Sequence, residues 1–227
     1  MKRLTLAGAS LAIVLFATQF AQADEVDDYI KSQMEQHRIP GVALEIIRDG
    51  KAVKTGAYGL ANLELKAPVK RETVFEIGSI TKTFTGIMLG EMVNEGLLKL
   101  DTPAQDCLPQ GVTMPSYEGR AIALLDLATH TSGLPEVPDD FESVPGYCFL
   151  TPFASYTVDE MYAFLSRYEL TRKPGTQYEY SNLGEGLLGN ILALKDGKTY
   201  EQLVIARICT PCATFVAYTP FGLFKTK

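Results

Sequence analysis

The sequence predicts an α+β protein, with an antiparallel sheet that has flanking helices and with a mainly helical subdomain. The sheet is indicated by residues 41–48 and 51–58, two β-rich runs joined by Asp49-Gly50, a dipeptide typical of a type I′ hairpin turn. A hydrophobic content of 46% and a charged content of 21% are typical of a globular chain. The helices are indicated by apolar residues at helical spacing in residues 24–38, 79–95, 157–165 and 183–194.

The N-terminal residues have the pattern of a secretory signal peptide. Two basic residues precede a short apolar run, residues 4–20, and an A-x-A cleavage site ends at Ala23, directly before Asp24. A membrane anchor is the alternative, but the apolar run is short and becomes polar near its end. We therefore predict a signal peptide over residues 1–23, cleaved between Ala23 and Asp24, and a periplasmic or secreted protein with no stable membrane span.

The first elements after the cleavage site follow in order. Residues 24–38 predict a helix that Pro40 ends, and the hairpin comes next. Residues 60–71 have no clear periodicity, so we expect an irregular link there. The formal net charge of -6 offers no basic surface, and no nucleic-acid partner is expected.

Residues 75–85 contain a candidate nucleophile. We predict a short strand or turn at residues 74–77, which delivers Ser79 to the first turn of a buried helix over residues 79–95. Lys82 lies three residues later, on the same helical face. Apolar neighbours would remove water from its ammonium group and favour the neutral amine, which could accept the proton of Ser79 Oγ. The alternative is a capping serine beside a solvated lysine.

Short helices and proline-rich loops characterise the chain after residue 101. Residues 122–128 predict a short apolar helix, and residues 135–153 form a long loop of the kind that often borders a site. Another helix begins at Thr157, with acidic residues in its first turn, and an apolar helix covers residues 183–194.

The four cysteines leave two questions open. Cys107 and Cys148 could form a disulfide in an oxidising compartment, but a sequence does not determine connectivity. Cys209 and Cys212 form a C-x-x-C pair without the strand–helix context of a redox site and without a histidine for zinc. No metal or organic cofactor is therefore expected.

Three motifs follow one another in a fixed order. Ser79-x-x-Lys82 is followed about a hundred residues later by Tyr180-Ser-Asn182, and the loop His-Thr-Ser-Gly-Leu-Pro begins between them at His130. In this order the chain resembles the serine β-lactamase and penicillin-binding protein superfamily, in its class C and D-alanyl-D-alanine carboxypeptidase branch. The resemblance covers roughly residues 24–210 and implies a β-lactamase/transpeptidase-like fold.

The resemblance also implies roles for four residues. Ser79 would attack an acyl carbonyl to form an acyl-enzyme, with Lys82 as its proton acceptor and with its own backbone N–H as half of an oxyanion hole. Tyr180 would pass the proton to the leaving group, and Asn182 would hold Lys82 and the substrate amide. The implied substrate is a β-lactam, a D-Ala-D-Ala peptide or an ester.

Two residues beside these motifs are expected to have structural roles. Tyr178 is a second phenol near Tyr180, but the spacing of the motif favours Tyr180. His130 is expected to orient its turn and not to act as a base.

The C-terminal part departs from the family pattern. The third family motif, Lys-Thr-Gly or His-x-Gly on a strand near the C-terminus, is missing from this part of the sequence. We predict a signal peptide over residues 1–23, a partial β-lactamase-like domain over residues 24–211 and an atypical tail over residues 212–227, with the C-terminal strands of the sheet missing.

The expected function is that of a serine hydrolase or acyltransferase acting on a small molecule or a peptidoglycan peptide. The alternative is a catalytically impaired, truncated remnant that binds β-lactams or peptidoglycan stem peptides without turnover. The sequence leaves the oligomeric state open.

Overall fold

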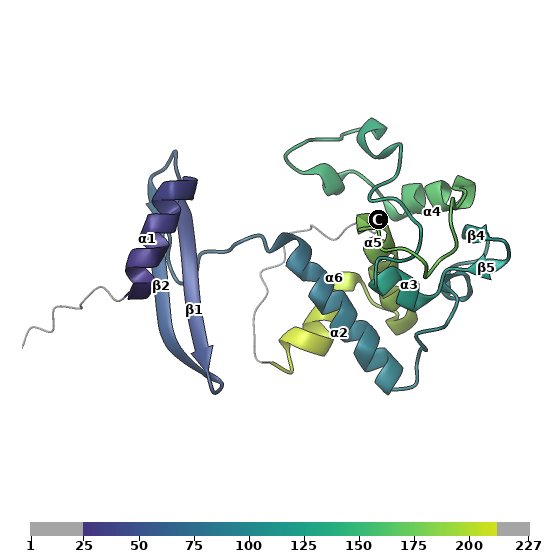
Figure 1. Ribbon diagram of the computed structural model, residues 1–227, viewed down its shortest axis with the longest axis horizontal. Coiled ribbons are helices and arrows are strands. Elements are labelled where there is room, and N and C mark those ends of the chain that lie inside the picture. Colours follow the sequence, from purple (N-terminus) through teal and green to yellow (C-terminus); the bar gives the residue numbers. More distant parts are fainter. Residues whose placement is uncertain (1–24, 213–227) are drawn as a thin grey trace, which may run out of the picture. The chain divides into compact units, whose positions relative to one another are not determined.

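The computed structural model describes residues 25–212 and divides the chain into two units (Figure 1). The first unit ends at Val74 and the second begins at Phe75. The predicted signal peptide, residues 1–23, and residues 213–227 of the predicted tail lie outside the described residues.

The first unit consists of one helix and a three-stranded antiparallel sheet of order β1-β2-β3. Its elements are α1 (Glu25–His37), β1 (Gly41–Arg48), β2 (Lys51–Asn62) and β3 (Ala67–Pro68). The predicted hairpin is confirmed, since Arg48 pairs with Lys51 and both turn residues have positive φ, 50° at Asp49 and 72° at Gly50. The prediction of an irregular link over residues 60–71 was wrong in part, because β2 continues to Asn62 and pairs with β3.

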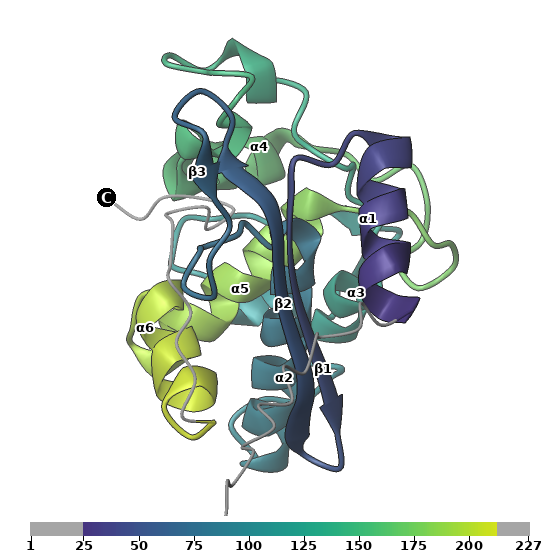
Figure 2. The same cartoon turned by 90° about the vertical axis from the view of Figure 1, so that its left-hand side faces the viewer.

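Helix α1 lies along this hairpin, as both views show (Figures 1 and 2). Asp27 of α1 accepts a hydrogen bond of 2.5 Å from Tyr58 Oη and forms an ion pair of 2.7 Å with Lys54. Both partners belong to β2, so the helix is attached to the sheet by polar contacts at one carboxylate.

The second unit is mainly helical, and α5 (Asn182–Asp196) runs through its core. Helices α2, α3 and α6 each contact α5, while β4 and β5 form a separate two-stranded sheet. Leu183, Leu187, Leu188 and Ile191 on α5 are completely buried. The predicted α+β class is thereby confirmed. The remaining elements are α2 (Thr81–Asn94), β4 (Ser116–Tyr117), β5 (Arg120–Ala121), α3 (Leu124–Ala128), α4 (Val158–Arg167) and α6 (Tyr200–Val204).

For the segment that leads into α2, a short strand or a turn was predicted, and the structure has a turn. Residues 74–77 form no strand, and a 3₁₀ turn over Gly78–Ile80 carries Ser79 into the helix. Helix α2 buries one face, with Met88 and Met92 inaccessible to solvent, whereas Ile80 and Ile87 are exposed. The expectation of burial on most sides was therefore wrong for the first turns of this helix.

Capping residues define the ends of the helices around the core. Thr157 caps α4 by accepting from Glu160 N at 3.3 Å, and Glu160 in return accepts from Thr157 N at 2.6 Å. Gly197 ends α5 in the left-handed conformation, with φ of 66°.

All four cysteines are free thiols, so the Cys107–Cys148 bridge is not formed. Among residues 25–212, no helix has the length and apolar character needed to cross a membrane.

Candidate active site

The four residues predicted to carry chemistry lie together in the second unit. Ser79 Oγ lies 2.7 Å from Tyr180 Oη and accepts a hydrogen bond of 3.1 Å from Lys82 Nζ. Lys82 Nζ also donates to Asn182 Oδ1 at 2.8 Å. A hydroxyl group held between an amine and a phenol has two groups within reach that can take its proton.

Lys82 reaches Ser79 because of local helical geometry. Ser79 lies in the 3₁₀ turn before α2 and Lys82 lies three positions later in the first turn of α2, so their side chains project from the same face. Asn182, the first residue of α5, approaches from the neighbouring helix and fixes the ammonium group from the other side. The side chain of Lys82 is half-buried, and its Nζ lies 4.8 Å from the centroid of the Tyr180 ring.

The Tyr180 phenol is activated by its neighbours. Burial on its own would raise the pKa of Tyr180, but hydrogen bonding with Lys82 and Ser79 and the charge of Lys82 outweigh burial and lower that pKa below its usual value. A phenol with a lowered pKa gives up its proton more easily to a leaving group and takes one from a hydroxyl group when it is ionised.

The loop that begins at His130 holds Tyr180 in place. His130 has a positive φ of 57°, its carbonyl oxygen accepts from Glu179 N at 2.8 Å, and its Nδ1 accepts from Ser181 N at 3.2 Å. Its ring lies 4.7 Å from the Tyr180 ring. Burial, with a smaller effect of the Lys82 charge, lowers the pKa of His130, so the neutral ring that can accept from Ser181 is favoured. These contacts agree with the structural role expected for His130.

Ser181 joins the same loop to the start of α5. Its hydroxyl donates to Pro135 O at 2.6 Å and accepts from Gly184 N at 2.8 Å, and the side chain is fully buried. As the N-cap of α5, Ser181 lies between Tyr180 and Asn182 and thus fixes the backbone on which both depend.

Tyr178, the phenol two residues before Tyr180, has different surroundings. Its side chain is 65% exposed, and its ring meets the edge of the His130 ring at 5.8 Å. The preference for Tyr180 over Tyr178 thus agrees with the positions of the two phenols.

Two carboxyl groups near the site were not predicted from the sequence. Glu136 Oε1 accepts a long hydrogen bond of 3.5 Å from Asn182 Nδ2. Glu185, one turn after Asn182 on α5, is only 5% exposed. The available signal was a single acidic residue within the apolar stretch of residues 183–194.

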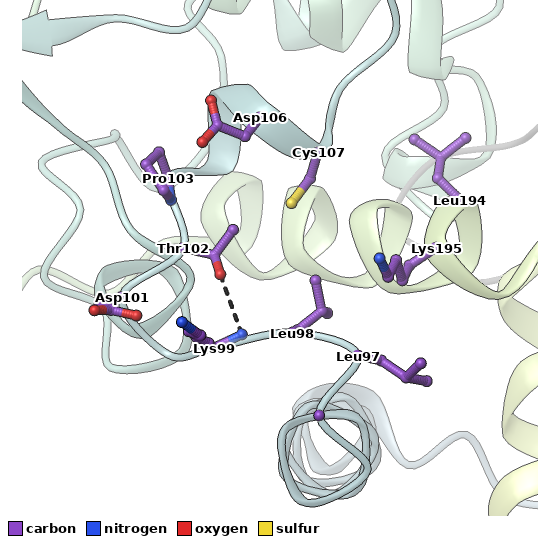
Figure 3. A pocket seen from close by; sticks show the side chains of 11 residues that line it. Leu97, Leu98, Lys99, Asp101, Thr102, Pro103, Asp106, Cys107, Leu194 and Lys195 are labelled. Atoms are coloured by element: carbon purple, nitrogen blue, oxygen red, sulfur yellow. Dashed lines mark hydrogen bonds between the residues drawn. The ribbon is translucent and has the colours of Figure 1, made fainter.

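A surface pocket of about 730 Å³ lies elsewhere in the second unit and does not include Ser79 (Figure 3). It is formed by the segment after α2 and by the end of α5, with charged side chains of both signs, and Thr102 Oγ1 accepts from Lys99 N at 3.1 Å. The residues lining the pocket are Gly96, Leu97, Leu98, Lys99, Asp101, Thr102, Pro103, Asp106, Cys107, Leu194 and Lys195.

In the part of the chain that the structure describes, no group of His, Cys, Asp and Glu could hold a metal ion.

Comparison with known families assigns most of the chain. A family model described as Beta-lactamase matches residues 26–218, which include all four residues of the site. The chain belongs to the beta-lactamase family.

Curated relatives in the beta-lactamase family include a Beta-lactamase and a carboxypeptidase. A Beta-lactamase of Escherichia coli K12 is 32% identical over 208 residues, which are 89% of this chain and 50% of that protein. The D-alanyl-D-alanine-carboxypeptidase/endopeptidase AmpH of the same organism is 34% identical over 199 residues, 87% of this chain and 50% of AmpH. The chain thus spans about half the length of the relatives it matches.

Solved structures of the beta-lactamase family have the same fold. The crystal structure of a Beta-lactamase/D-alanine Carboxypeptidase from Yersinia pestis, complexed with citrate, matches with a TM-score of 0.75 and 30% identity over 83% of this chain and 52% of that chain. An octameric penicillin-binding protein homologue from Pyrococcus abyssi matches with a TM-score of 0.69 and 29% identity, covering 83% of this chain and 42% of that chain. The predicted β-lactamase/transpeptidase-like fold is confirmed.

A Lys-Thr-Gly tripeptide, the same three residues as in the third beta-lactamase-family motif, occurs in the first unit. Lys54, Thr55 and Gly56 spell Lys-Thr-Gly on β2, ahead of Ser79 in the chain and not after Asn182. The ammonium group of Lys54 is paired with Asp27 of α1 at 2.7 Å. This ion pair indicates that Lys54 helps to hold α1 against the sheet.

Proposed function

We propose that the site forms an acyl-enzyme at Ser79 and thereby acts as a serine hydrolase or acyltransferase. The observation that carries the proposal is the position of Ser79 Oγ, 3.1 Å from Lys82 Nζ and 2.7 Å from Tyr180 Oη. The membership of the chain in the beta-lactamase family supports it.

In the proposed reaction, Ser79 Oγ attacks the carbonyl carbon of the substrate. The hydroxyl proton passes to Lys82 or to Tyr180, whose lowered pKa suits it to the second transfer, from Tyr180 to the leaving nitrogen or oxygen. Asn182 keeps Lys82 in place through the hydrogen bond of 2.8 Å and has its amide group available for the substrate. Water then hydrolyses the Ser79 ester, or another nucleophile takes the acyl group.

The proposed substrate class is a β-lactam, a D-Ala-D-Ala peptide or a simple ester. All three present a carbonyl group whose leaving atom needs a proton, which is the task assigned to Tyr180. The names of the relatives, Beta-lactamase and D-alanyl-D-alanine-carboxypeptidase/endopeptidase, support the first two. We propose that the protein acts in the periplasm or outside the cell, where these substrates occur.

Covalent labelling with a fluorescent penicillin tests the proposal. We expect a labelled band on a denaturing gel, and no band for Ser79→Ala, because the ester that retains the fluorophore is formed only at Ser79 Oγ. Ser166→Ala is the matched control, since Ser166 is an exposed serine on α4 whose hydroxyl donates to Tyr162 O at 2.9 Å. Labelling of Ser79→Ala equal to that of the unmodified chain would contradict the proposal.

The alternative, binding without turnover, gives a different result. In that case a β-lactam would raise the melting temperature of the chain without leaving a covalent adduct, because binding to the folded state alone is stabilising. Mass spectrometry of the intact chain after incubation distinguishes the two functions, because only the acyl-enzyme gains the mass of the β-lactam.

A further inference from the structure

Glu185 is a buried acidic residue that the reaction proposed above does not use. It lies in the first turn of α5, is 5% exposed, and has leucines that are fully buried on both sides of it in the sequence, Leu183 and Leu187. A carboxyl group in such surroundings is uncommon, because removing its charge from water is costly unless a partner compensates.

The carboxyl group has an unsatisfied oxygen. Glu185 Oε2 is buried and has no hydrogen-bond partner among the described residues. Burial raises the pKa of Glu185 to about 7, and the charge of Lys82 opposes this rise. Near neutral pH the group therefore exists in both its neutral and its ionised form.

Helix geometry places Glu185 next to the site. Asn182 and Glu185 are three positions apart on α5, so they lie on the same face one turn from each other. Asn182 Oδ1 accepts from Lys82 Nζ at 2.8 Å, and α2, which carries Lys82, packs against α5. Glu185 thus lies one helical turn beyond Asn182, the residue that binds Lys82.

Three further carboxyl groups lie on other elements that pack against α5. Asp126 on α3 is paired with Arg120 at 2.9 Å. Glu201 lies in the first turn of α6, and Asp106 lies on the 3₁₀ turn Ala104–Cys107. Among the described residues, Lys82 is the one whose charge acts on Glu185.

We propose that Glu185 is a positioning residue of the Ser79 site, whose buried carboxyl group acts electrostatically on Lys82 from the face of α5 that also carries Asn182. This proposal rests on the proposed function of the site. When Glu185 is neutral, it adds no charge beside Lys82 and Ser79. When Glu185 is ionised, its negative charge acts on Lys82 and through it on Ser79, so the reactivity of Ser79 changes with the charge of Glu185.

The coupling between the two residues is testable without any activity. Carboxyl ¹³C NMR of the chain should show one glutamate that titrates near pH 7, and this signal should be missing from Glu185→Gln. In Lys82→Met, which removes the cation but keeps a long side chain, the midpoint of Glu185 should rise by about one pH unit. An unchanged midpoint in Lys82→Met, or a Glu185 signal that titrates below pH 5, would overturn the proposal.

A second measurement tests the effect on the site itself. In the unmodified chain the rate of labelling by a fluorescent penicillin should change between pH 6 and pH 8, and Glu185→Gln should remove this change. Glu169→Gln, at an exposed glutamate before the segment of Tyr180, is the matched control and should retain it. Glu185→Leu should give the same flat profile, which covers the case in which the glutamine variant does not fold.

The two measurements separate the proposals. If the chain is labelled and Glu185→Gln keeps the pH dependence of the unmodified chain, the role of Glu185 is disproved while the function stands. If no labelling occurs at all, the proposed function fails, and the NMR comparison with Lys82→Met decides on the coupling alone.

Discussion

Ser79, Lys82 and Tyr180 form a small network in which two of the polar atoms have two partners each. Lys82 Nζ is shared between Ser79 and Asn182, and Ser79 Oγ is shared between Lys82 and Tyr180. A proton taken from Ser79 is therefore shared among the residues of the network, as is general for strongly interacting titratable groups. The protonation state of any neighbour with a pKa near 7 then affects the whole network.

The buried carboxyl group of Glu185 also makes the stability of the fold depend on pH. Its pKa is raised from 4.5 to about 7, so the folded state binds more protons than the unfolded state between these values. The contribution is fully present below pH 4.5 and is lost as the pH rises through 7. Glu185→Leu removes this dependence, so we expect it to be more stable than the unmodified chain at pH 8, by on the order of 2 kcal/mol.

Urea unfolding at pH 5 and pH 8 checks this expectation. The difference between the free energies of unfolding of Glu185→Leu and the unmodified chain should be larger at pH 8 than at pH 5. Glu169→Gln should show no such difference, because that side chain is exposed. Equal differences at both pH values would mean that the carboxyl group is not buried in the folded protein.

At the scale of single elements, helix α5 contributes residues both to the core and to the candidate site. Its first residue, Asn182, binds Lys82, while its central residues fill the core. The N-cap residue Ser181 lies at the junction, and its hydroxyl bonds to both Gly184 N and Pro135 O. A change at this cap should therefore affect stability and chemistry together.

Two cap substitutions separate these effects. Ser181→Ala should cost about 2 kcal/mol of stability, because a buried cap and a bond to Pro135 O are lost, and it should slow penicillin labelling roughly 10- to 100-fold through displacement of Tyr180 and Asn182. Thr157→Ala removes the cap of α4 and should cost about 1 kcal/mol without changing the labelling rate. Urea unfolding and labelling time courses measure both. Equal labelling rates for the two variants would contradict the role assigned to Ser181.

Elements with strong local signals were predictable from the sequence, and those that depend on tertiary contacts were not. The Asp49-Gly50 turn and the acidic first turn of α4 are encoded within a few residues. The short strand β3 was missed, because Ala67–Pro68 pairs with β2 without any alternation of its own. The 3₁₀ turn that carries Ser79 also has no local signal that distinguishes it from a strand end.

The candidate site was predictable where its residues form motifs, and only there. Ser79 and Lys82 are linked by helical spacing, but Tyr180 and Asn182 were brought to them by resemblance to a family and not by any local rule. Glu185 belongs to no motif, and its importance depends on burial, which a single acidic letter in an apolar stretch does not reveal.

At the scale of the whole molecule, the two units differ in how much apolar surface they bury. The described part of the first unit has one buried side chain, Val69, whereas the second unit contains a core of leucine, methionine and aromatic residues. A small sheet without a buried face is at best marginally stable, since folding must offset the loss of chain entropy.

We therefore expect the two units to behave differently when they are produced separately. A fragment of residues 25–74 should show no cooperative thermal transition by circular dichroism, because it buries too little apolar surface. A fragment of residues 75–212 should keep helical signal and melt over a narrow temperature range. A sharp transition in the smaller fragment would show that its sheet is stable without a larger core.

The hydrogen bond between Ser79 and Tyr180 joins residues that are 101 positions apart. Contacts of such long range form slowly, because the entropy of closing the intervening loop is lost before the contact is gained. During synthesis, Ser79 and Lys82 leave the ribosome well before Tyr180 and Asn182 do, so a nascent chain at first carries only half of the candidate site. If Ser79 forms the proposed acyl-enzyme, it does so only once α5 has joined the core, and a penicillin label would mark completed chains only.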